Sequence, residues 1–166
     1  MKKPEATRHT ERDFHELTWH DCHIWGFEIR AGDPEAHDWT SELVFDIDYI
    51  VSWSCAIGEA EFQVAPAALT FHGVTAPRIR IESEDDDSRV AVGPPSIDRI
   101  EREPVPDQKV FLDRPYYRWR IRLNSPRAGA ISFGAWGFTQ LLLSDPLTTT
   151  GRQHLTMTER RRLLGR

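Results

Sequence analysis

The hydrophobic and polar positions between residues 41 and 53 alternate with a period of two. A helix would spread such residues around its circumference, whereas an extended strand places all of them on one face. The pattern therefore predicts a long antiparallel strand with its apolar side on the core and with Asp46 and Asp48 on the opposite side. The predicted inward face consists of Leu43, Phe45, Ile47, Tyr49, Val51 and Trp53.

The same alternation recurs in shorter segments that are separated by glycine and proline turn signals. Residues 22–30 are predicted to pair with 41–53 in a hairpin with a long loop, and residues 116–123 are predicted to pair with 130–138. Helical character is confined to residues 158–164. Further strands are expected at 59–65, 68–74, 78–82 and 97–102. The predicted fold class is all-β: an antiparallel β-sandwich or open barrel of about eight strands, with a short C-terminal helix.

The chain divides into a tail and one domain. Residues 1–13 are polar and contain nothing that could bury a face, so we expect a flexible N-terminal arm. Residues 14–166 are expected to form a single β domain, since a chain of 166 residues is long enough to bury a sizeable core. Within this domain, residues 84–108 form an irregular excursion. A loop of that length is uncommon, which is why one short strand is placed inside it.

The net charge and the two cysteines indicate which partners and which cellular compartment to expect. A net charge of -5 argues against a general nucleic-acid binder and against a membrane-surface protein, because both need a positive field. Cys22 and Cys55 have no ligand-like spacing and are expected to be free, buried thiols in a reducing compartment. The sequence shows no apolar run of about 18 residues and no signal-peptide pattern. The expected location is therefore the cytoplasm.

A basic stripe is predicted on the second most regular strand. Arg118, Arg120 and Arg122 alternate with core positions, so they share the opposite face. Arg78 and Arg80 would extend the stripe if their strand belongs to the same face. Guanidinium groups bind phosphate and carboxylate in a bidentate manner, so the stripe is a candidate ligand-binding surface.

Asp46 and Asp48 belong to the same candidate set, because they too lie opposite the core residues of their strand. If the two strands share a sheet, these carboxylates should pair with the arginines, and the stripe would then be structural. We expect this compensated arrangement. If the aspartates lie elsewhere, the stripe is left to an anionic ligand or an acidic partner.

The densest cluster of reactive side chains is the one formed by His20, Asp21 and His23. Together with Asp46 and Asp48 it offers imidazole and carboxylate groups that suit zinc, manganese or iron. On a regular strand, however, two histidines that differ by three positions project to opposite faces. We therefore expect a hydrogen-bonded turn at Asp21 and no metal or other cofactor.

Two further patterns carry no site. The acidic run Glu84–Asp87 lacks the alternating ligand spacing of a calcium loop, and we expect a solvated loop tip. Ser52, Ser54 and Ser132 lack a local nucleophile motif.

Five segments of the chain carry a resemblance to other proteins: Asp46–Ile50 with Trp53, Val64–Phe71, Ile131–Phe133, Gly137–Gln140 and Glu159–Arg160. In these segments the chain resembles a group of small uncharacterised bacterial single-domain proteins. The similarity covers roughly residues 15–162. It implies a recurring single-domain fold, and it brings no established activity and no site residues.

These observations favour a non-catalytic, cytoplasmic β-domain that recognises a protein partner or a small ligand through one sheet face or the excursion at 84–108. A small acidic domain of this kind is also typical of toxin-neutralising immunity proteins. The alternative is a metal-dependent hydrolase that uses His20, Asp21 and His23 with Asp46 and Asp48. Neither a membrane nor a nucleic acid is expected as a partner, and the sequence does not fix the oligomeric state.

Overall fold

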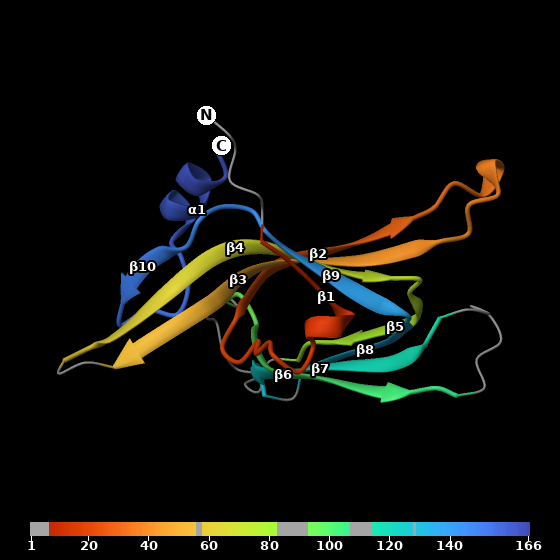
Figure 1. Ribbon diagram of the computed structural model, residues 1–166, viewed down its shortest axis with the longest axis horizontal. Helices are drawn as coiled ribbons and strands as arrows, with labels where there is room; N and C mark the ends of the chain where they lie inside the picture. Colours follow the sequence, from red (N-terminus) through yellow and green to blue (C-terminus); the bar gives the residue numbers. More distant parts are fainter. Residues whose placement is uncertain (1–6, 56–57, 83–92, 107–113, 128) are drawn as a thin grey trace.

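The computed structural model describes residues 7–55, 58–82, 93–106, 114–127 and 129–166, and its strands form one ten-stranded antiparallel open sheet (Figure 1). The strand order is β1-β9-β4-β3-β2-β6-β7-β8-β5, and β10 pairs with β4. The predicted all-β fold class is confirmed. The strands are β1 (Arg8–Thr10), β2 (His23–Ala31), β3 (Ser41–Cys55), β4 (Ala60–His72), β5 (Thr75–Arg80), β6 (Ser96–Pro104), β7 (Tyr117–Ser125), β8 (Ala130–Ala135), β9 (Gly137–Leu142) and β10 (Leu147–Thr150). The helical elements are η1 (Glu11–Asp13), η2 (Pro34–Ala36) and α1 (Met157–Leu163).

The sheet folds back on itself at a corner, where one pair of hydrogen-bonded strands is followed directly by a second pair. β4 runs into β5 and β8 runs into β9, while β4 pairs with β9 and β5 pairs with β8. At the corner, the Trp136 N–H donates to the His72 carbonyl over 3.1 Å. Gly73 has a φ of 64°, a conformation that glycine adopts without a steric penalty. The turn brings β7 and β8 across from β4 and β9.

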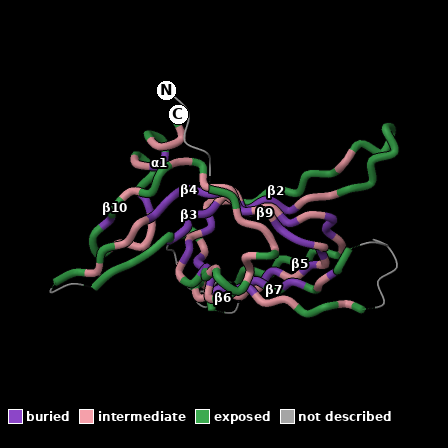
Figure 2. Tube along the Cα trace, in the orientation of Figure 1, coloured by how far each residue is buried: buried purple, intermediate pink, exposed green. Residues whose placement is uncertain are grey.

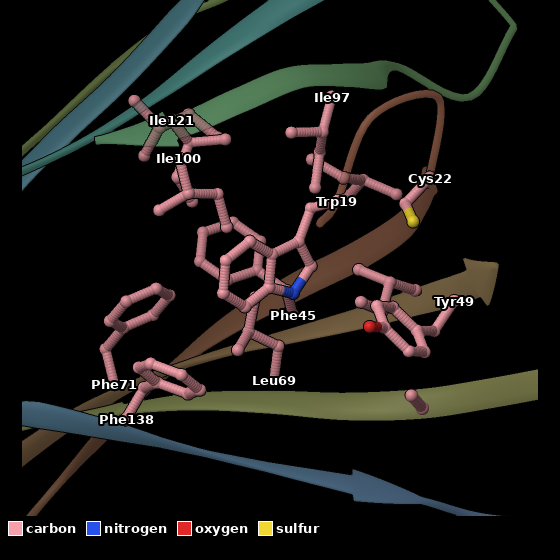
Figure 3. Close-up of a cluster of buried hydrophobic side chains, with 14 of the residues drawn as sticks. Trp19, Cys22, Phe45, Tyr49, Leu69, Phe71, Ile97, Ile100, Ile121 and Phe138 are labelled. Atoms are coloured by element: carbon pink, nitrogen blue, oxygen red, sulfur yellow. The ribbon is translucent and has the colours of Figure 1, made fainter. Parts of the chain in front are cut away.

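Aromatic side chains fill the space between the two halves of the sheet (Figure 3). The Phe71 ring on β4 lies 4.6 Å from the Phe133 ring on β8 and 5.0 Å from the Trp119 ring on β7, measured between centroids. Both pairs meet edge to face, which is a favoured geometry for aromatic rings. In Figure 3, Ile100 and Ile121 approach the same cluster from the opposite half. The core is therefore shared by strands that are far apart in the sheet order.

The long strand β3 is buried at its centre and exposed at its end. Phe45, Ile47 and Tyr49 are buried, as the alternation predicts. The register between β3 and β4 then shifts at a β-bulge next to Ile50, and the hairpin continues beyond the core. Val51 and Trp53 lie past this point and are 43% and 68% exposed, so the prediction that they face inward was wrong. Figure 2 shows this exposed end and the exposed end of the β2–β3 hairpin on opposite sides of the buried centre.

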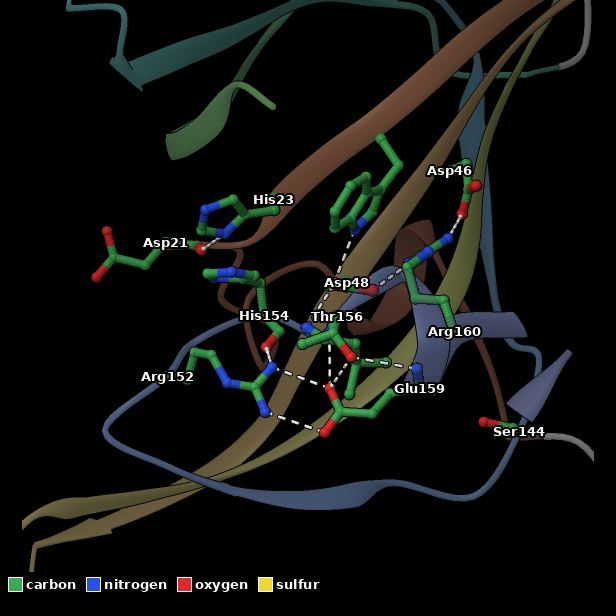
Figure 4. Close-up of polar contacts among 12 residues, drawn as sticks. Asp21, His23, Asp46, Asp48, Ser144, Arg152, His154, Thr156, Glu159 and Arg160 are labelled. Atoms are coloured by element: carbon green, nitrogen blue, oxygen red, sulfur yellow. Dashed lines mark hydrogen bonds and ion pairs between the residues drawn. The ribbon is translucent and has the colours of Figure 1, made fainter. Parts of the chain in front are cut away.

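The outer face of β3 is covered by the C-terminal segment (Figure 4). Asp48, which the sequence pattern places on an open face, is fully buried. Its carboxylate accepts hydrogen bonds from the Trp25 indole N–H and the Leu155 backbone N–H, each over 2.8 Å, and forms an ion pair with Arg160. The Arg160 guanidinium also donates to Asp46. One buried arginine thus fixes the C-terminal segment to the sheet.

The helix α1 begins with a capping box. The Thr156 hydroxyl accepts from the Glu159 N–H over 3.2 Å, and the Glu159 carboxylate accepts from the Thr156 N–H over 2.6 Å. Arg152 forms a bidentate pair with the same carboxylate and lowers the pKa of Glu159 to about 2. A seven-residue helix is too short to be stable alone, so the cap and Arg160 hold it in place. The predicted helix at 158–164 is displaced by one residue.

Several expectations need adjustment at the edges of the fold. Residues 8–13, predicted to belong to a flexible arm, form β1 against β9 and the turn η1. β6 confirms the short strand expected inside the excursion at 84–108, and the acidic run Glu84–Asp87 lies outside the described residues. No disulfide joins Cys22 to Cys55. Cys22 is buried, which raises the pKa of its thiol to about 12, but Cys55 is exposed, contrary to expectation.

Among the helices in the described part of the chain, none has both the length and the apolar character needed to cross a membrane.

Replacement of a core side chain on β3 tests the burial pattern. Phe45→Ala should lower the free energy of unfolding by about 3–5 kcal/mol, because it leaves a cavity under the aromatic cluster. Val51→Ala, on the exposed end of the same strand, should change it by less than about 0.5 kcal/mol. Urea denaturation of both variants measures the difference, and equal small losses would show that Phe45 is not part of the core.

The Arg160 contact gives a second prediction. Arg160→Met should destabilise the chain by about 3–5 kcal/mol, because the buried Asp48 carboxylate would lose its only ion-pair partner among the described residues. Arg161→Met removes the same charge from an exposed position of α1 and serves as the control, with an expected change below about 0.5 kcal/mol. Thermal and urea unfolding provide the measurement. Similar losses in the two variants would contradict the assigned role of Arg160.

Candidate arginine groove on the outer sheet face

Two strands that flank β8 in the sheet, β5 and β7, present arginine side chains on their outer face. Residues that pair across antiparallel strands project to the same side of the sheet. The central strand, β8, has a small residue at each outward position, and its neighbours supply the long side chains. The paired rows are Arg120 with Ser132 and Arg78, Arg122 with Ala130 and Arg80, and Arg118 with Gly134 and Thr75.

This arrangement forms a hollow that we call the arginine groove. Its volume is about 790 Å³, and it continues over Gly134 into a second hollow of about 500 Å³. Neighbouring strands lie about 4.8 Å apart, so the two walls stand roughly 10 Å from each other. Glu101 and Glu103 on β6 also line the groove. The walls are Arg78 and Arg80 on β5 and Arg118, Arg120 and Arg122 on β7, and the floor is Ala130, Ser132 and Gly134 on β8.

The floor depends on a glycine at one end. A Cβ atom on Gly134 would lie 2.4 Å from the Tyr116 hydroxyl oxygen and 2.7 Å from the Thr75 hydroxyl oxygen, so no side chain fits. The two hydroxyls are themselves 2.6 Å apart and hydrogen-bonded. Tyr116 is buried, which raises the pKa of its hydroxyl. Gly134 therefore lets Tyr116 close the end of the groove without displacing β8.

The arginines of the groove are only partly neutralised. Arg122 pairs with Glu101 over 2.9 Å and Arg80 pairs with Glu82 over 2.9 Å. Arg122, by its hydrogen bond, is the main cause of a lowered Glu101 pKa, and Arg120 adds a smaller electrostatic contribution. Within the described part of the chain, no ion pair joins a carboxylate to Arg78, Arg118 or Arg120. Glu103 and Glu101 on β6 lie opposite Arg118 and Arg120 in the register but form no ion pair with them, so the three guanidinium groups remain available to an anion.

The expected compensation by Asp46 and Asp48 does not occur. Both carboxylates bind Arg160 on the outer side of β3, and β3 is separated from β7 by β2 and β6 in the sheet order. The prediction was wrong because the cation that pairs with both aspartates comes from α1, which is distant in sequence, and not from β7. The structure therefore divides the candidate set into an arginine groove and a separate buried ion pair.

The residues of the proposed metal cluster lie in a hydrogen-bonded turn. The Asp21 carboxylate accepts from the Gln153 side chain over 2.9 Å, and the His20 Nδ1 atom lies 3.0 Å from the Asp98 carbonyl oxygen. His23 instead faces His154, with ring centroids 4.5 Å apart, and its pKa is lowered, first by burial and then by that neighbour. Among the described residues, no three His, Cys, Asp or Glu side chains converge as metal ligands.

Sequence reasoning found the walls of the groove but missed its floor. The alternation of small and large residues from Ala130 to Ala135 was the available signal, because small outward residues between two arginine-bearing strands leave a trough. It also missed Arg160. An aspartate pair on an otherwise apolar strand required a cation, but spacing alone did not identify which arginine would supply it.

Neither family models nor curated proteins nor solved structures provide a match to the chain. Function therefore has to be inferred from the geometry of the groove itself.

Proposed function

We propose that the chain is a non-catalytic binding domain that holds a multivalent anion in the arginine groove. The observation that carries this proposal is the row arrangement of Arg78, Arg118 and Arg120 above the small residues of β8. Among the described residues no carboxylate forms an ion pair with these three. The anionic groups are phosphates or carboxylates, carried by a small ligand or by a partner protein.

The spacing of the arginines favours a ligand with several charges. Alternate residues on a strand are about 6.7 Å apart, so neighbouring guanidinium groups along β7 repel each other by about 0.6 kcal/mol in water and by more near a protein surface. A single chloride-like ion cannot satisfy both walls of a groove that is roughly 10 Å wide. A ligand with two or more anionic groups can contact both walls and relieve the repulsion.

The lining of the groove supports recognition of charge rather than of flat rings. The three aromatic residues that line the groove and its extension are buried: Trp119, Tyr116 and Phe133. Binding of single-stranded nucleic acid usually requires exposed aromatic rings on which bases stack. The guanidinium groups, in contrast, offer planar pairs of donors that match phosphate and carboxylate.

Calorimetric titration with inorganic tripolyphosphate at low salt tests the proposal. We expect saturable binding of one ligand per chain that weakens as salt is added. Arg120→Ala should weaken binding about tenfold or more, since a charge-assisted hydrogen bond contributes about 1.5–3 kcal/mol. Arg161→Ala removes the same charge from the exposed surface of α1 and should leave binding within about twofold.

A third variant separates a shaped site from a diffuse positive field. Ser132→Leu keeps the charge but fills the floor, so it should weaken binding as Arg120→Ala does. A hexaglutamate peptide, titrated in parallel, distinguishes a protein-borne carboxylate source from a phosphate ligand. Absence of saturable binding for both probes, or equal losses in Arg120→Ala and Arg161→Ala, would overturn the proposed function.

A further inference from the structure

A second surface with unpaired backbone groups lies on the edge of β2, which β6 separates from the groove strand β7 in the sheet order. β2 pairs with β3 along its length, but on its other side it pairs with β6 only at His23, opposite Ser96. From residue 26 to Ala31 no strand among the described residues occupies that edge. Figure 1 shows the β2–β3 hairpin projecting from the body of the sheet at this point.

The direction of the backbone shows which groups face the open edge. The Gly32 N–H donates to the Thr40 carbonyl over 2.6 Å, so Gly32 points toward β3. Backbone direction alternates along a strand, and Arg30 and Glu28 therefore also point toward β3. The N–H and C=O groups of residues 27, 29 and 31 consequently point outward, where no ladder partner is described.

The side chains along this edge are apolar on one face. Phe27 and Ile29 are 43% and 53% exposed, and they lie opposite the buried residues Phe45 and Leu43 of β3. They thus continue the core face of the sheet past the point where β6 diverges. Exposed apolar residues beside an unpaired backbone edge are a template for the addition of another strand.

The free edges formed by β5, β1 and β10 are protected, and the edge of β2 is not. β5 carries Pro77, a register irregularity and a positive φ of 46° at Ala76, all of which hinder the addition of a strand. β1 has three residues and β10 has four, which is too short to act as a template. β2 has nine residues, contains no proline and carries none of these devices past its bulge near residue 25.

We propose that a second copy of this chain pairs with the β2 edge, antiparallel, around a two-fold axis at Ile29. In this register Ile29 lies opposite the partner's Ile29, and Phe27 lies opposite the partner's Ala31. The outward N–H and C=O groups of residues 27, 29 and 31 all find partners. The apolar faces of the two hairpins then form one continuous strip, and each closed two-fold contact uses the same patch on both copies.

Charge complementarity selects this register. Glu28 lies opposite the partner's Arg30, and Arg30 lies opposite the partner's Glu28, so each of the two ion pairs is intermolecular. Moving the two-fold axis by one residue in either direction shifts the register by two and would place Glu28 opposite the partner's Glu28 or Arg30 opposite the partner's Arg30. Like charges directly across a strand pair are destabilising. In a single copy the two side chains satisfy each other, with 2.6 Å between Arg30 Nε and Glu28 Oε1.

A charge-reversal series tests both the partner and the register, with mass measured by light scattering over a range of concentrations. The unmodified chain should reach twice the mass of one chain. Glu28→Arg alone should weaken association about tenfold, because an arginine would then face an arginine at both of these strand pairs. The double variant Glu28→Arg/Arg30→Glu should restore association. A monomer at all concentrations, or a double variant as weak as the single one, would overturn the proposal.

A second pair of variants keeps the test independent of the charge series. Ile29→Arg places two positive charges at the two-fold axis and should abolish the dimer. Val51→Arg introduces the same charge at another exposed apolar position, on the β3–β4 hairpin, and should leave the dimer intact. Circular dichroism melts verify that both variants are folded. Loss of the dimer in both, or in neither, would contradict pairing through β2.

Discussion

The contact of Phe71 with Trp119 and Phe133 holds the two halves of the sheet together, and the remaining surfaces follow from it. A flat sheet of ten strands would leave one apolar face in water. The chain avoids this because β4 continues into β5 past Gly73, and β8 continues into β9, so the sheet turns over without losing its ladder. What was one face becomes an interior lined by aromatic rings.

The outer face that results has two different halves. Over β2 and β3 it is covered by the C-terminal segment, which the buried pair of Asp48 and Arg160 fixes in position. Over β5, β7 and β8 it carries the arginine groove. The same turn also explains the open edge of β2, because β6 leaves β2 after one pair to follow β7 into the other half. A closed core, a basic groove and an unprotected edge are therefore consequences of one folding constraint.

Local alternation predicted the interior of the strands well and failed where the chain leaves the core. Phe45 and Ile47 could be assigned from period-two spacing because their strand is regular there. Trp53 could not, since nothing in the spacing reveals a bulge or the projection of a hairpin beyond its neighbours. The predicted environment of Asp48 was wrong for another reason, because only tertiary packing brings Arg160 to this carboxylate. The same pairing leaves the arginines of β7 without the aspartate partners that were expected for them.

The central claim is that the arginine groove is a shaped anion site and that other basic surfaces are not. Two-dimensional amide NMR spectra of the ¹⁵N-labelled chain, recorded during a titration with tripolyphosphate at low salt, locate the bound anion without any substitution. The structure predicts saturable shifts concentrated at Ala130, Ser132 and Gly134 and at the arginines of β5 and β7. Shifts centred on Arg161 and Arg162 of α1, or spread evenly over all arginines, would contradict it.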